Sequence, residues 1–153
     1  MPTIFDELGI RPVINAAGTL TRLGGSLMRS EVGDAMVSAA AANVRIEELE
    51  ARAGGIIAEI TGAESGYVSC GAAAGLLLSE AACMAGGDIV RMNRLPDASG
   101  MPTEVVVQLG HRCDYDSALR PAGASSGEVG YAAETLPWEV EAGRGSRTAT
   151  ASV

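Results

Sequence analysis

The sequence contains no lysine: Lys and Arg together number 11, and all eleven are arginines. No side chain can therefore form a Schiff base with a carbonyl compound or act as a lysine base. Aromatic residues make up only 3% of the chain, so any hydrophobic core must be built from aliphatic side chains and methionine. The three cysteines, Cys70, Cys83 and Cys113, are odd in number and show no Cys-x-x-Cys spacing. This excludes a disulfide-rich scaffold and favours a reducing, cytoplasmic compartment.

Basic clusters are also lacking. Nineteen acidic residues against eleven arginines give a net charge of −8, which disfavours binding to nucleic acid or to an anionic membrane. The most apolar stretch, residues 66–79, is glycine-rich and shorter than the roughly 20 residues that cross a bilayer. We therefore expect neither a nucleic-acid partner nor a membrane span.

The 153 residues are enough for one domain, and a chain of this size buries about 70% of its unfolded surface. Residues 1–29 read as an irregular arm with one helical turn near residues 4–8. Ser30 is a suitable N-cap for a first helix. Apolar residues spaced by 3, 4 and 7 predict a second helix over residues 46–60, and the Gly54-Gly55 pair within it indicates either a weak point or close packing.

From residue 66 onward, short β-type segments alternate with helical ones. We predict strands at 67–70, 88–92, 104–108, 127–129 and 147–153, and helices at 72–85, 114–122 and 136–142. This alternation predicts an α/β fold with a mostly parallel sheet flanked by helices. We expect residues 1–65 to form an N-terminal arm with helices, and residues 66–153 to form the first half of a large α/β domain that is incomplete here.

The predicted turn between the first strand and its helix is the best candidate site. Its sequence, Ser69-Cys70-Gly71-Ala72-Ala73-Ala74, places small residues at a helix N-terminus, where free amides and the helix dipole attract an anion. The alternative is that Gly71 and Gly75 merely let the helix pack closely. The turn is neither a P-loop nor a Gly-x-Gly-x-x-Gly dinucleotide motif.

The single histidine, His111, and its neighbour Arg112 directly follow the strand predicted at 104–108. Ligands in open α/β sheets lie at the carboxyl ends of strands, and an arginine can hold a carboxylate or phosphate through two hydrogen bonds. The alternative is a structural histidine with satisfied hydrogen bonds. The spacing of His111, Cys113, Asp114 and Asp116 matches no standard metal-ligand pattern.

Several stretches together resemble the selenocysteine synthase (seryl-tRNA selenium transferase)-like branch of pyridoxal 5′-phosphate (PLP)-dependent enzymes, particularly the D-glucosaminate-6-phosphate ammonia-lyase group. The resemblance is carried by residues 11–19, 23–26, 48–64, 69–76, 95–97, 104–108 and 110–116, and it thins beyond residue 125. It implies the aspartate-aminotransferase-type fold (fold type I) and a dimer or larger homo-oligomer. The implied reaction is α,β-elimination or β-replacement on a small amino acid or a phosphorylated aminosugar acid.

The resemblance also implies roles for individual residues. Cys70, Gly71, Ala72 and Ala73 would hold the cofactor phosphate, and His111 would lie against the pyridine ring. Three residues would face the substrate or a neighbouring subunit: Asn15, Thr19 and Arg112.

The chain also departs from that family. Family members are more than twice as long, and their Schiff-base lysine and the acid that pairs with the pyridine nitrogen follow the region present here. We therefore expect an N-terminal portion of such an enzyme, with no catalytic residue of its own, that is inactive alone and binds PLP at best weakly and non-covalently. Two alternatives stay open: a non-catalytic truncated product or partner subunit of a full-length relative, and a small phosphometabolite-binding α/β module.

Overall fold

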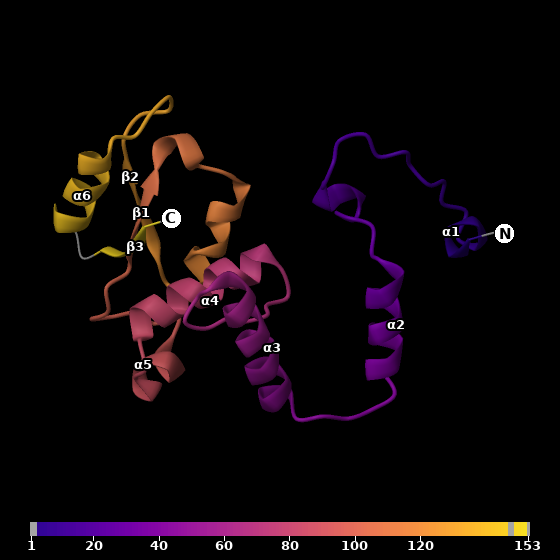
Figure 1. Ribbon diagram of the computed structural model, residues 1–153. Coiled ribbons are helices and arrows are strands. Elements are labelled where there is room, and N and C mark those ends of the chain that lie inside the picture. The colour runs from indigo at the N-terminus through magenta and orange to yellow at the C-terminus, as the bar shows by residue number, and fades with distance from the viewer. Residues whose placement is uncertain (1–2, 147–148, 153) are drawn as a thin grey trace. The chain divides into compact units, whose positions relative to one another are not determined.

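The computed structural model describes residues 3–146 and 149–152 and divides the chain into two units, Met1–Leu49 and Glu50–Val153 (Figure 1). The domain boundary expected near residue 65 concerns a longer enzyme and stays a prediction.

The first unit contains the predicted helical turn, α1 (Ile4–Glu7), a short 3-10 helix, η1 (Thr21–Leu23), and the predicted first helix, α2 (Ser30–Ala39). The N-cap of α2 is Arg29, not Ser30, because Arg29 holds the extended backbone (φ −73°, ψ 149°) and Ser30 is already helical. Between residues 3 and 49, no side chain is buried. This part of the chain therefore has no hydrophobic core of its own.

The long helix α3 (Ile46–Thr61) runs into the second unit and confirms the second predicted helix. Gly62, with φ +74°, follows its end, as expected for a glycine C-terminal stop. The remaining elements are α4 (Ala72–Ala85), α5 (Ile89–Arg94), β1 (Glu104–Gln108), η2 (Leu109–His111), η3 (Asp114–Ala118), η4 (Arg120–Ala122), β2 (Ser125–Val129), α6 (Pro137–Ser146) and β3 (Ala149–Ser152).

The sheet has the order β2-β1-β3, and both pairings are parallel. This confirms the predicted parallel α/β arrangement. The central strand β1 is buried at Val105, Val106 and Val107, as a strand covered on both faces must be. Val105 and Val107 join the core cluster that includes Met84 of α4, and the Val106 side chain lies at Gly143 of α6. Successive side chains of a strand point to opposite faces, so α4 and α6 pack against opposite faces of β1.

Two predicted strands are wrong. Residues 67–70 are extended, but in the described residues they join no sheet. Residues 88–92 instead begin α5, where the Asp88 side chain accepts hydrogen bonds from the amides of Val90 (2.9 Å) and Arg91 (3.3 Å). This N-cap outweighs the β propensity of Ile89 and Val90.

The helix predicted over 114–122 is instead two short 3-10 helices, η3 and η4, on either side of Leu119. Pro121 lies in η4, and a proline cannot donate the backbone hydrogen bond that a continuous α-helix requires. The predicted final strand is confirmed at β3, whereas residues 147, 148 and 153 lie outside the described residues. No described helix is long and apolar enough to cross a membrane.

Glu80 of α4 is buried although its side chain is ionisable. Its side chain is 2% exposed, and its Oε1 atom has no hydrogen-bond partner within the described chain. Burial raises the pKa of the Glu80 carboxyl above its usual 4.5, because a charged carboxylate is costly to remove from water.

We expect Glu80→Gln to raise the free energy of unfolding at pH 7, because it removes a desolvated charge at nearly constant volume. A raised pKa means that the wild-type chain gains stability as the pH falls through the folded-state pKa. The advantage of the variant should therefore disappear below about pH 4.5, the usual pKa of the group. Urea unfolding across this pH range measures it, with Glu59→Gln, at an exposed position of α3, as the control. If Glu80→Gln still raises the free energy of unfolding at pH 3, the buried charge of Glu80 is not the cause of the effect.

Candidate functional site

The predicted anion-binding turn forms at the start of α4. Gly71 is the N-cap residue, with φ +111° and ψ 169°, and no side chain caps the helix. This backbone conformation favours glycine. The helix begins with the hydrogen bond from the Gly75 amide to the Gly71 carbonyl (3.0 Å). The amides of Ala72, Ala73 and Ala74 therefore precede the first intrahelical bond, and no acceptor for them lies among the described residues.

The turn is open to solvent. Cys70, Gly71, Ala72 and Ala73 are all exposed, and no atom outside the turn lies within 4 Å of a Cβ built on Gly71. The three cysteines, Cys70 included, are free. Unpaired amides at the positive end of a 14-residue helix give this surface the donors and the dipole that an oxyanion requires.

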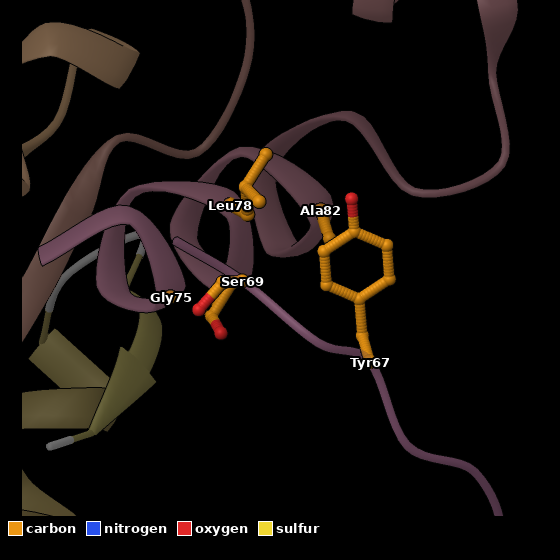
Figure 2. Close-up of a pocket in the computed structure, with 6 residues that line it drawn as sticks. Tyr67, Ser69, Gly75, Leu78 and Ala82 are labelled. Atoms are coloured by element: carbon orange, nitrogen blue, oxygen red, sulfur yellow. The ribbon is translucent and has the colours of Figure 1, made fainter. Parts of the chain in front are cut away.

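A cavity of about 450 Å³ lies beside the turn (Figure 2). Tyr67 and Ser69 approach it from the extended segment that precedes the turn, and Gly75, Leu78 and Ala82 line it from α4. A Cβ on Gly75 would lie 3.3 Å from the Ser69 hydroxyl oxygen. Gly75 thus lies close to Ser69, outside the sheet, so packing of this helix on the sheet through Gly75 stays a prediction, whereas the backbone conformation of Gly71 forms the turn itself.

Helix α3 positions the segment that leads into the turn. The Val68 amide donates to Oε2 of Glu50 (3.4 Å), and Gly54 of α3 is buried against Gly66. Of the two readings of the Gly54-Gly55 pair, close packing is correct for Gly54. The sequence does not reveal the contribution of Gly66, because no local pattern reports a contact across such a separation.

His111 ends the 3-10 helix η2, which directly follows β1. Because β1 and β2 are parallel, the loop after β2 lies at the same edge of the sheet. His111, Tyr131 and Glu134 accordingly line one cavity of about 170 Å³. His111 is exposed, and its imidazole has no hydrogen-bond partner within the described segments. The expected contact of His111 with a pyridine ring stays a prediction.

Arg112 differs, because its guanidinium is already occupied. It forms ion pairs with Asp116 in η3 and Glu128 in β2. The hydrogen bond to Asp116 raises the pKa of Arg112, and the same bond lowers the pKa of Asp116 below its usual 3.8. Arg112 thus ties η3 to the sheet, and its expected substrate contact stays a prediction that would require these pairs to open.

We expect Arg112→Gln to lower the urea midpoint of unfolding at pH 7 by breaking both pairs. A lowered pKa means that the Asp116 carboxylate stabilises the fold above pH 3.8 and loses this effect as the pH falls through its folded-state pKa. The difference between variant and wild type should therefore shrink below about pH 3.8. Arg120→Gln is the matched control, because Arg120 lines the same hollow without an ion pair among the described residues. Equal midpoints for both variants would refute the role of Arg112.

Asn15 and Thr19 belong to the first unit, where they line a cavity of about 870 Å³. The Asn15 amide is engaged in its own loop: Nδ2 donates to the Gly18 carbonyl (2.6 Å), and Oδ1 accepts from the Ala17 amide (2.9 Å). Asn15 therefore shapes the loop, while Thr19 lies on the cavity wall. The described residues contain no group of three or more side chains that could hold a metal ion.

Comparisons with known proteins find similarity to enzymes. No family model matches the chain. It is 39% identical over 152 residues to a D-glucosaminate-6-phosphate ammonia lyase from Salmonella typhimurium, covering 97% of this chain and 41% of the relative. It is 39% identical over 150 residues to a 5′-C-glycyluridine monooxygenase-decarboxylase from a Streptomyces species, covering 95% of this chain and 38% of the relative.

The fold agrees with this similarity. A solved structure of D-glucosaminate-6-phosphate ammonia-lyase matches 99% of this chain and 42% of its own length, with a TM-score of 0.91 and 37% identity. The chain therefore spans about two-fifths of the length of the curated relatives that it matches. Over nearly its whole length, in sequence and in fold, the chain is similar to part of an ammonia-lyase.

Proposed function

We propose that this chain is the cofactor-phosphate-binding portion of a PLP-dependent lyase that acts on an aminosugar acid. The observation that carries the proposal is the set of unpaired, exposed amides at the start of α4, in a chain 39% identical to part of an ammonia-lyase. Small side chains at Gly71, Ala72 and Ala73 let a phosphate group approach the backbone closely. The donor set therefore fits the phosphate of PLP.

The residues of the chain would bind and orient the cofactor. The turn from Cys70 to Ala73 holds the phosphate, and His111, with a free imidazole at the carboxyl edge of the sheet, packs against the pyridine ring. When bound, PLP supplies an electron sink for negative charge developing at the α-carbon of an amino substrate. With no lysine in the chain, binding here is non-covalent, and the isolated chain does not complete the reaction.

The two relatives support a separation between cofactor binding and the choice of reaction. They are equally identical to this chain yet carry different reaction names, an ammonia lyase and a monooxygenase-decarboxylase. We propose that the shared portion serves cofactor binding, which both reactions would need. Elimination from a phosphorylated aminosugar acid is the reaction we favour, because the solved structure that matches is an ammonia-lyase.

The finer family assignment is also a proposal. It comprises fold type I, the selenocysteine synthase-like branch, a cytoplasmic location and a homo-oligomer. Self-association is supported by the apolar face of α2, where Val32, Met36 and Val37 are exposed, and by the absence of buried residues between 3 and 49. Light scattering on the purified chain tests it: a stable monomer at micromolar concentration would contradict self-association.

Titration of the full chain with PLP, followed by absorbance and equilibrium dialysis, tests the cofactor proposal. We expect saturable binding that dialysis reverses. After borohydride treatment, mass spectrometry should find no cofactor on any side chain, the N-terminal amine being the one competing site for imine formation. Absence of saturable binding would refute the proposal.

The same amides favour a second candidate, a module that binds a phosphorylated metabolite other than PLP. Competition separates the two functions, since both would use the turn. If inorganic phosphate displaces PLP with equal affinity, the pyridine ring contributes nothing and the second candidate is preferred. A clear preference for PLP over inorganic phosphate favours the first.

A further inference from the structure

The cavity of about 870 Å³ in the first unit has an unusual polar lining for so acidic a chain. Two arginines, Arg11 and Arg22, lie on its wall together with the hydroxyls of Thr19 and Ser26. Apolar side chains, including Phe5 and Leu23, complete the lining. Small-molecule sites typically combine an apolar wall with a few polar groups in a volume of this order.

Neither arginine has a partner within residues 3–146 and 149–152. Arg45, Arg91 and Arg112 form ion pairs, and Arg94 donates to backbone carbonyls. No ion pair or hydrogen bond joins Arg11 or Arg22 to any described side chain or carbonyl. Acidic residues outnumber arginines in this chain by 19 to 11, yet these two guanidiniums in one cavity stay unpaired among the described residues. Together they offer about ten N–H donors to a bound ligand.

The walls of the cavity are held by contacts of their own. The Asn15 side chain holds the loop through its hydrogen bonds with Gly18 and Ala17. An antiparallel bridge joins Leu20 to Gly25 across the 3-10 turn that carries Arg22. A preorganised loop loses little conformational entropy when a ligand binds.

We propose that this cavity binds the oxyanion group of a small molecule, a phosphate or a carboxylate, through Arg11 and Arg22. A guanidinium matches both groups through two parallel hydrogen bonds. Thr19 and Ser26 supply further donors at the same wall. A phosphorylated aminosugar acid carries both a phosphate and a carboxylate, so the inference that the oxyanion belongs to the substrate rests on the proposed function. The inference that the cavity binds an oxyanion does not rest on it.

Residue-resolved NMR tests the proposal on the full chain labelled with ¹⁵N-arginine. We expect the side-chain Nε–H signals of Arg11 and Arg22 to shift saturably on addition of inorganic phosphate, while those of Arg29, outside the cavity, stay in place. Glycerol 3-phosphate and D-gluconate form separate arms, because the first carries only a phosphate and the second only a carboxylate. A shift with either arm supports the site and identifies the group that it prefers. No saturable shift with any of the three anions would overturn it.

The variants Arg11→Gln and Arg22→Gln, singly and combined, provide the second measurement. In the Ala73→Glu background, where phosphate binding at the cofactor turn is weakened, we expect the double variant to weaken phosphate binding in equilibrium dialysis at least about tenfold, equivalent to about 1.4 kcal/mol, and the control Arg29→Gln to change it less than twofold. An equal loss in the control would show non-specific attraction and overturn the proposal. In Ala73→Glu, which addresses the cofactor turn, the Arg11 and Arg22 shifts should persist, so that failure of one proposal is distinguishable from failure of the other.

Discussion

Replacing Ala73 by glutamate is expected to weaken PLP binding at least about tenfold, a loss of about 1.4 kcal/mol or more. Ala73 is the second residue of α4 and is exposed, so the new side chain needs no rearrangement of the core. Its carboxylate would stand among the amides that we assign to the cofactor phosphate, where it would repel the phosphate and compete for the same donors. Equilibrium dialysis against PLP measures the effect.

The same substitution should not destabilise the chain. A negative charge in the first turn of a helix stabilises it by about 0.3–1 kcal/mol. Unfolding therefore cannot explain a loss of binding, and circular dichroism should show an unchanged or raised thermal midpoint. Gly87→Glu is the control: Gly87 is exposed just beyond the other end of α4, in open space, and the substitution adds the same charge. If Ala73→Glu binds PLP as tightly as the control does, the phosphate lies elsewhere.

The adjacent glycines Gly54 and Gly55 are expected to respond to alanine in opposite directions. A Cβ on Gly54 would lie 2.2 Å from the backbone oxygen of Gly66 and 3.1 Å from its carbonyl carbon. Neither atom belongs to a flexible side chain, so α3 and the segment at Gly66 must move apart. Such overpacking costs about 1–3 kcal/mol, and we expect a net loss in the free energy of unfolding even though alanine favours a helix by about 1 kcal/mol over glycine.

Gly55 supplies the control one residue away. It is exposed in the same helix, and a Cβ added to it would have no neighbouring atom within 4 Å. Gly55→Ala should therefore stabilise the chain by about 0.5–1 kcal/mol. Urea unfolding followed by circular dichroism compares the two variants. Because the segment at Gly66 continues into the turn at Gly71, Gly54→Ala should also weaken PLP binding; a stabilised Gly54→Ala variant would show that the close contact is not required.

Local sequence patterns predicted an element correctly where the pattern spans several helical turns or a single buried strand. Periodic apolar residues predicted α3, and three consecutive valines predicted β1, whose three central residues are buried. The start of α4 followed from a glycine before a run of small residues. These signals are local, since each is contained in the residues of one element.

Local patterns failed where two tendencies compete within a few residues. Ile89 and Val90 favour a strand, but the Asp88 side chain caps a helix there. Tyr67 and Val68 also have β propensity, yet a strand needs a neighbour, and among the described residues none pairs with them. Propensity alone could not show which tendency prevails, because pairing depends on segments distant in sequence.

The sequence by itself determined the chemistry that the chain can offer: no lysine to hold a carbonyl compound, one histidine after a buried strand, and a helix start with unencumbered amides. Only the tertiary structure decided which polar groups are free to use. In the folded chain, Arg112 forms ion pairs with Asp116 and Glu128, whereas Arg11 and Arg22 have no partners among the described residues. The physical reason is that a hydrogen bond or an ion pair depends on distance in space, and Glu128 comes within reach of Arg112 only when β2 pairs with β1.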